Sequence, residues 1–419
     1  MTENLSKSKW RRFQTGVLFL LVGTNPLPNY VAGCLLTKPE GTIVLLATED
    51  TYAIADRLKQ ILQAKGKTEN QNWNISEPRE IAHTDASRIH SKVSELIREY
   101  ADEGSMGLNY TGGTKAMAVH AYRAIADERP DAVFSYLDAR ELAMRIERLD
   151  APIRVKKVGT DCRISLGELM QLHGRRMKDP ITKSWFPKVA NTLAKLHQDK
   201  AFRNDWRQWC NQNLRRDNRP DKFKSKQMLR EVPIPQDEPL KQVFQAFEAE
   251  SFTTLGDLEL LLRDRVLAQG ATKWSIKHLA EWLDGKWLED YVLDAFQEIA
   301  AEVGLHEVAM NIEAAVGQTK FEFDVAAIRG YQLFAVSCTT STSKGLCKSK
   351  LFEAYLRSHQ MGGDEAHTAL VSMYDDPAKL KSEIEESWFT QGHVEAFGPG
   401  ELVDLSEHLK QWVRTSARL

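Results

Sequence analysis

A short stretch rich in glycine and threonine, residues 108–117, carries the side chains best suited to bind an anion. It joins an apolar segment at 106–110 to an alanine-rich segment at 116–126, a pattern that predicts a strand followed by a helix. Glycines at such a junction let a bulky ligand approach the backbone, and the helix start offers unpaired N–H groups and a positive dipole end. The candidate ligand residues are Thr111, Gly112, Gly113, Thr114 and Lys115.

The position of Lys115 supports this interpretation. Acidic residues are preferred in the first turn of a helix, so a lysine there is locally unfavourable and suggests that an anion binds beside it. The spacing of a GxxxxGK[ST] phosphate-binding loop is absent, and the GxGxxG pattern of dinucleotide-binding folds is absent too. An ordinary strand–turn–helix connection is the alternative.

Two further polar turns lie in the N-terminal third, after apolar runs at 16–23 and 42–47. These runs have the length and composition of strands covered on both faces of a parallel sheet. Because ligands bind beyond the carboxyl ends of such strands, the polar turns form, with the glycine-rich turn, a hydrogen-bonding rim suited to ribose, phosphate or base edges. The turns add these candidate ligand residues: Thr24, Asn25, Pro26, Thr48 and Glu49.

The strands that carry this rim alternate with helical segments. Repeated β–α units predict a Rossmann-like parallel sheet with right-handed crossovers, closed by an antiparallel pair at 142–149 and 153–158. Helices are expected at 29 onward, 50–64, 86–100 and 116–126, and further strands at 79–82 and 132–137.

In the C-terminal third, Asp324 stands between Phe323 and Val325 in a strand-like run at 320–328. An unpaired buried charge is costly, so a carboxylate in this position favours function over structure. Glu322 lies on the same face, since side chains alternate along a strand. The predicted order is a helix at 285–303, strands at 307–312, 320–328 and 332–339, a helix at 348–360 and a strand at 368–372.

The middle of the chain, residues 161–284, is expected to be helical or winged-helix-like. Residues 166–176 and 183–215 have helical patterns, and residues 232–235, Val-Pro-Ile-Pro, indicate a rigid linker. Residues 214–226 carry six basic side chains; basic residues interleaved with aromatics can follow a phosphate backbone. A solvated loop is the alternative, and we favour it for this segment.

Composition limits the protein class. The 419 residues predict two or three domains, and a net charge of −2 gives no overall attraction to nucleic acid or membrane. The five cysteines form no CxxC pair, which indicates neither a disulfide framework nor a zinc site. The longest apolar run, residues 17–22, is too short to span a bilayer, and residues 1–15 lack the apolar core of a signal peptide. A cytoplasmic protein with reduced thiols is expected.

The N-terminal third resembles a known family. A first strand ending in Gly-Thr-Asn-Pro at 23–26, and a later strand running into Asn-Tyr-Thr-Gly-Gly-Thr-Lys-Ala-Met at 109–117, are similar to those of CARF domains. These domains sense cyclic oligoadenylates in type III CRISPR immunity. The resemblance covers residues 13–160 and implies a homodimer with the cyclic ligand, expected to be cyclic tetra-adenylate, across its two-fold axis. It also implies an effector domain further along the chain.

The C-terminal third resembles the PD-(D/E)xK restriction-endonuclease-like effectors that are fused to CARF domains. In that family an acidic residue on the opening helix and the aspartate of the second strand hold a divalent metal, and Glu289 and Asp324 match these positions. The resemblance implies Mg²⁺ or Mn²⁺, which suit carboxylate ligands and activate water for phosphodiester hydrolysis. A helix start also gives Glu289 and Asp290 a structural reason to be acidic.

The third strand departs from this pattern, because Ser337-Cys338-Thr339 stands where the family has an acid and a lysine two residues apart. The lysine could come instead from Lys344, Lys348 or Lys350, and the carboxylate from Glu322 or Glu353.

Three domains are therefore predicted: a CARF sensor at 1–160, a helical or winged-helix-like linker at 161–284, and a restriction-endonuclease-like effector at 285–419. The first hypothesis is a metal-dependent endonuclease for DNA or RNA that a cyclic oligoadenylate activates. Its candidate catalytic residues are Asp324, Glu289, Lys348, Lys350 and Glu322. The rival hypothesis is a ligand-sensing, nucleic-acid-binding regulator with a degenerate nuclease domain.

Overall fold

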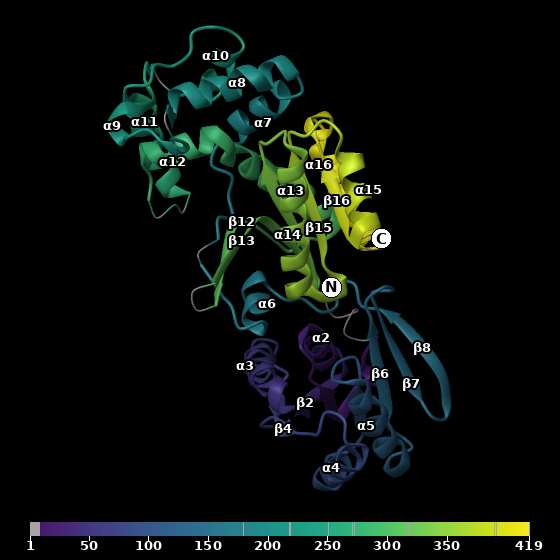
Figure 1. Ribbon diagram of the computed structural model, residues 1–419. Coiled ribbons are helices and arrows are strands. Elements are labelled where there is room, and N and C mark those ends of the chain that lie inside the picture. Colours follow the sequence, from purple (N-terminus) through teal and green to yellow (C-terminus); the bar gives the residue numbers. More distant parts are fainter. Residues whose placement is uncertain are drawn as a thin grey trace.

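A computed structural model describes residues 9–178, 180–217, 219–249, 251–269, 271, 273–316, 319–388, 390 and 392–418. Figure 1 shows three parts: the N-terminal sheet at the bottom of the view, a second sheet in the middle, and a helical group above it. Among the described residues, no helix combines the length and the apolar composition needed to cross a membrane.

The N-terminal sheet has the predicted Rossmann-like form. Its order is β3-β2-β1-β5-β6-β7-β8, with β4 paired to β2. Pairing is parallel from β3 to β6 and antiparallel between β6, β7 and β8, so the predicted closing pair is confirmed. The elements are η1 (Arg11–Phe13), β1 (Thr15–Leu21), α2 (Leu27–Leu36), β2 (Thr37–Ala47), η2 (Glu49–Thr51), α3 (Tyr52–Thr68), β3 (Asn74–Ile75), β4 (Arg79–Glu80), α4 (Ala86–Glu99), η3 (Ala101–Glu103), β5 (Met106–Asn109), α5 (Lys115–Glu128), β6 (Val133–Asp138), β7 (Ala143–Arg148) and β8 (Ala151–Lys157).

The middle of the chain is mostly helical, and two predictions for it are wrong. The expected helix at 166–176 ends early, because Gly174 adopts a positive φ of 69°, and Arg176 then pairs in β9 with β12. The basic segment forms a two-stranded hairpin rather than a loop. The elements are α6 (Leu166–Leu172), β9 (Arg176–Met177), α7 (Pro187–Leu196), α8 (Lys200–Asn213), β10 (Arg215–Arg216), β11 (Arg219–Phe223), α9 (Lys226–Arg230), α10 (Leu240–Gln245), α11 (Leu255–Ala268), α12 (Ile276–Glu281) and the π-helical turn η4 (Trp282–Lys286).

The C-terminal sheet follows the predicted helix–strand–strand–strand–helix order. Its strand order is β16-β15-β14-β13-β12-β9, with the hairpins antiparallel and β14, β15 and β16 parallel. The elements are α13 (Trp287–Val303), β12 (Glu307–Val316), β13 (Thr319–Arg329), β14 (Gln332–Thr339), α14 (Lys344–Gly362), η5 (Gly363–Glu365), β15 (His367–Ser372), α15 (Pro377–Trp388), β16 (Val394–Phe397), η6 (Pro399–Glu401) and α16 (Leu405–Ser416).

Two hydrophobic cores cross between these parts. One core joins Leu20 of β1 to Leu333 of β14 and Met361 of α14. Another joins Trp206 of α8 to Trp287 of α13 and continues under the C-terminal sheet. The C-terminal sheet is therefore packed against both other parts by buried apolar side chains, and a displacement of one part strains its neighbour.

Candidate functional site

A cavity of about 600 Å³ lies where β1, β5 and β6 end. This is the edge of the sheet at which ligands of doubly wound folds bind. Of the predicted rim, the structure brings five residues to the cavity wall: Thr24, Asn25, Thr111, Gly112 and Gly113.

The glycine-rich turn needs its glycines. A Cβ on Gly112 would collide with the carbonyl oxygen of Leu21, and Gly113 has a positive φ of 75°. The side chain of Thr111 accepts a hydrogen bond of 2.8 Å from the backbone N–H of Leu137, which fixes the turn against β6. The turn is thus held in one conformation at the mouth of the cavity.

The other predicted rim residues lie outside this cavity wall. Thr114 caps α5, where its hydroxyl accepts a bond of 3.1 Å from the N–H of Met117. Thr48 is the N-cap residue of the short helix η2, where its hydroxyl hydrogen-bonds with that of Thr51, and Pro26 precedes α2 without a side-chain cap hydrogen bond. Lys115 and Glu49 are exposed on the surface nearby. For Thr114 and Thr48, local capping explains the residue type.

The opposite wall of the cavity comes from the C-terminal part of the chain, which the sequence did not predict. It consists of the last turn of α14 and of η5, and its lining residues are His359, Gln360, Gly363, Asp364 and Glu365. Burial raises the pKa of Glu365 to about 8, so this carboxyl is protonated at neutral pH. The sequence signal, Gly-Gly-Asp-Glu, is that of a helix end, and sequence periodicity cannot show what faces it.

A second polar cluster forms where α13, β13 and β14 meet. Asp324 accepts two hydrogen bonds at Oδ2, one of 3.0 Å from Ser337 Oγ and one of 2.6 Å from the N–H of Cys338. Burial, followed by the charge of Asp324, raises the pKa of Glu289 on α13 to about 8, and the exposed Glu322 adds to this rise. Glu289 and Asp324 are thus close enough for their charges to oppose each other.

The lysines of α14 divide into two groups. Lys350 donates to the carbonyl oxygen of Cys338 at 3.5 Å, so its ammonium lies at the end of β14 beside the two carboxylates. Lys344 and Lys348 pair with Glu383 of α15. Glu353 is exposed on the same helix. Of the candidate replacements for the missing lysine, the structure brings Lys350 to the cluster.

Asp290, next to Glu289, serves the fold. It is fully buried and accepts hydrogen bonds from the N–H groups of Trp185 and Phe186, at 2.8 and 3.0 Å, and from Trp282 Nε1 at 3.1 Å. Burial raises its pKa to about 6. Asp290 therefore joins the start of α7 to α13.

The oxygen atoms of the cluster suit a hard divalent cation. Within the described ranges, no group of three or more His, Cys, Asp or Glu side chains is placed to hold a metal by itself. Magnesium, however, keeps several waters and needs one or two protein carboxylates, with substrate phosphates completing its shell. Glu289 and Asp324 meet that requirement, and their mutual repulsion would fall when a cation binds between them.

Comparison with known proteins agrees with this architecture. The family model described as "Card1-like, endonuclease domain" matches residues 277–416, so the C-terminal part of the chain is a Card1-like endonuclease domain. This match confirms the predicted restriction-endonuclease-like domain. A search of curated proteins gave no match.

Two solved structures are similar over nearly the whole chain. One is protein VC1899 from Vibrio cholerae, with a TM-score of 0.67 at 16% identity over 96% of this chain and 98% of that one. The other is Can2 from Sulfobacillus thermosulfidooxidans in complex with cyclic tetra-adenylate, with a TM-score of 0.63 at 15% identity over 97% and 99%. At such identities the likeness concerns the fold, and it confirms the predicted arrangement of a Rossmann-like sheet followed by a nuclease-like α/β domain.

Proposed function

We propose that this protein is a CRISPR-associated nuclease that a cyclic oligoadenylate activates. The observation that carries the proposal is the Card1-like endonuclease domain, in which Glu289, Asp324 and Lys350 converge at the end of β14. The cavity at the glycine-rich turn supports a ligand-binding role for the N-terminal part, and Can2, whose fold is similar, was solved with cyclic tetra-adenylate. In this proposal residues 1–160 bind the cyclic ligand, residues 161–284 form the linker domain, and residues 285–419 cleave the nucleic acid.

In the proposed chemistry, Glu289 and Asp324 would hold Mg²⁺ or Mn²⁺. When bound, such a metal supplies an activated water and neutralises charge on the phosphate. Ser337 and the N–H of Cys338 keep the Asp324 carboxylate oriented by their two hydrogen bonds. Lys350 places a positive charge at the same point, where it would stabilise the developing negative charge of the phosphoryl oxygens.

A second function has one observation in its favour. Ser337 and Thr339 stand where the family has an acid and a lysine, and Ser337 uses its hydroxyl to bind Asp324. A chain that lost its chemistry in this way would be a ligand-sensing, nucleic-acid-binding regulator.

Cleavage assays separate these functions. Plasmid DNA, single-stranded DNA and RNA are incubated with the protein and Mn²⁺, with and without cyclic tetra-adenylate, and Asp324→Asn serves as the inactive control. Ligand-dependent cleavage by the wild type that the variant lacks supports the nuclease. If calorimetry shows ligand binding but no substrate is cleaved, the nuclease function would be refuted and the regulator function supported.

A further inference from the structure

A separate cavity of about 550 Å³ lies between α8 of the helical part and the loop that follows β14. From α8, Arg203 and Arg207 line it, and Arg215 of β10 adds a third guanidinium. Facing them are the hydroxyl-bearing residues 339–343 of the loop. Guanidinium and hydroxyl groups together are the usual donors to phosphate oxygens.

The charge of this cavity is positive. Asp284, the acidic residue of its wall, pairs with Arg215. Arg203 is 6% exposed and pairs with Asp375, and burial lowers the pKa of His197 to about 4, so that histidine is neutral.

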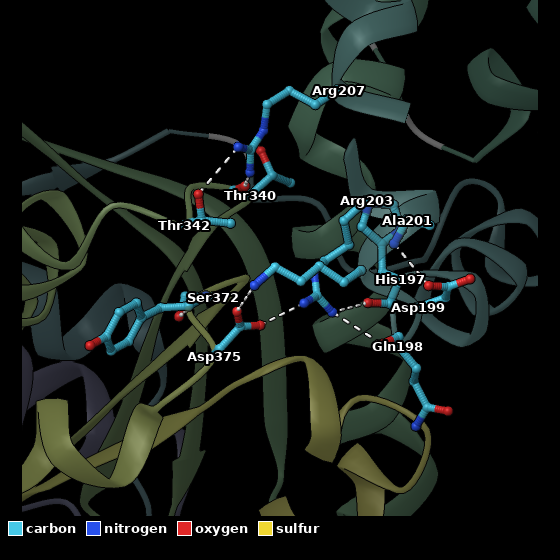
Figure 2. A network of polar contacts seen from close by, with 12 residues as sticks. His197, Gln198, Asp199, Ala201, Arg203, Arg207, Thr340, Thr342, Ser372 and Asp375 are labelled. Carbon is cyan, nitrogen blue, oxygen red and sulfur yellow. Dashed lines mark hydrogen bonds and ion pairs between the residues drawn. The ribbon is translucent and has the colours of Figure 1, made fainter. Parts of the chain in front are cut away.

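Arg207 is exposed, and the two groups that accept its hydrogen bonds are both neutral. They are Thr342 Oγ1 at 3.2 Å and the carbonyl oxygen of Thr340 at 3.4 Å (Figure 2). Its positive charge is therefore presented to the cavity, held in place by the loop that leads into α14.

The cavity continues the carboxylate cluster. Thr339 lines it and follows Ser337 by two residues, so both side chains lie on the same face of β14, about 7 Å apart. Ser337 binds Asp324. A polymer lying along this face would reach both Arg207 and the cluster.

Among the described residues that line the cavity, no ring is exposed enough for a base to stack on it, and the ring of His197 is 3% exposed. Trp206 lines the cavity but is 3% exposed, and its indole N–H is committed to the carbonyl oxygen of Leu283 at 3.2 Å. Without stacking platforms, contacts here are limited to phosphate and sugar, which carry no sequence information.

We propose that the cavity between α8 and residues 339–343 binds the phosphodiester backbone of the nucleic-acid substrate, with Arg207 as a phosphate-positioning residue. The inference deepens the proposed function, since it assigns the helical part of the chain a role in substrate binding. It also makes binding tolerant of base sequence and sensitive to salt.

The test is fluorescence anisotropy with labelled single-stranded DNA of two unrelated sequences, in EDTA and with cyclic tetra-adenylate present. Arg207→Ala, at an exposed position, is expected to bind both sequences about tenfold more weakly and to reduce the slope of log affinity against log salt by about 0.7. The control is Arg123→Ala, which removes the same charge from a 71% exposed position on α5 and should match the wild type.

Binding in EDTA is independent of cleavage. A wild type that binds DNA but cleaves nothing would therefore refute the proposed nuclease activity without contradicting the proposed binding of the DNA backbone in this cavity. Equal affinity of Arg207→Ala and wild type for both DNAs would overturn the inference. So would a wild type that binds neither DNA. Cyclic oligoadenylate is a phosphodiester too; if Arg207→Ala weakens its binding, measured by calorimetry, while DNA affinity stays unchanged, the cavity belongs to that ligand instead.

Discussion

The substitution Asp324→Asn tests the carboxylate cluster through stability as well as activity. An asparagine oxygen can still accept from Ser337 Oγ and from the N–H of Cys338, so the geometry is kept while one negative charge is removed. That charge is one of the causes that raise the pKa of Glu289 from 4.5 to about 8. The variant should therefore lower the pKa of Glu289.

Proton linkage gives the direction in which the free energy of unfolding changes with pH. In the folded protein Glu289 keeps its proton up to about pH 8, whereas in the unfolded chain it loses it near 4.5, so its ionisation reduces stability progressively as pH rises between these values. The whole rise corresponds to about 5 kcal/mol; burial is its largest cause and the charge of Asp324 the second, so the share of Asp324 is on the order of 2 kcal/mol. At pH 9 the loss of the Asp324 charge should therefore raise the free energy of unfolding of Asp324→Asn by about this amount relative to wild type. At pH 5, where Glu289 is protonated in the folded protein, it should give no such gain.

The assay is thermal unfolding in EDTA at both pH values, monitored by differential scanning calorimetry. Two hydrogen bonds to a charged acceptor become weaker in the variant, but this loss is equal at both pH values and cancels in the comparison. The melting temperature of the variant minus that of the wild type should be larger at pH 9 than at pH 5, by about 2 °C, since a chain of 419 residues unfolds with an entropy of about 0.9 kcal/mol per kelvin. The same difference from wild type at both pH values would refute the coupling of the two carboxylates.

Four other outcomes are expected. Lys115→Ala should weaken cyclic tetra-adenylate binding about tenfold in calorimetry, because it would remove the charge-assisted hydrogen bond that we expect between this exposed lysine and the ligand; unchanged affinity would show that Lys115 is not part of the ligand site. Lys350→Ala should slow Mn²⁺-dependent cleavage about a hundredfold, whereas Lys348→Ala, which removes a partner of Glu383, should leave the rate within about twofold of wild type; the reverse order would exchange their roles. Ligand affinity should fall above about pH 8, where Glu365 ionises and repels an anion, and Glu365→Gln should abolish that fall; a variant with the wild-type pH profile would contradict this. Light scattering should give a dimer mass without ligand, since a two-fold ligand requires an isologous interface, and a monomer mass would contradict it.

The sequence predicted the elements of the two sheets well because their signals are local. Continuous apolar runs identified β1 and β2, and the alternation around Asp324 identified β13. The glycine-rich turn could be placed because Gly112 and Gly113 meet a backbone requirement that their residue type reveals.

The missed features depend on contacts distant in sequence. Nothing local shows that Glu365 and Asn25 line the same cavity, or that Arg207 reaches the loop after β14. Likewise, Lys344, Lys348 and Lys350 look equivalent in the sequence, and only their direction around α14 separates the residue near Cys338 from the pair at Glu383. Capping roles were hidden too, since a threonine before a helix suits a ligand and a helix cap equally.

Helix α14 begins beside the carboxylate cluster and ends in the wall of the ligand cavity. Its 19 residues span about 28 Å, so one rigid element carries groups of both sites. Linkage between two binding equilibria is reciprocal: if the ligand raises the affinity for nucleic acid, nucleic acid raises the affinity for the ligand by the same factor. Protein molecules with bound nucleic acid would then hold the ligand more tightly. As the ligand concentration falls, molecules without nucleic acid would lose the ligand, and with it their activity, first.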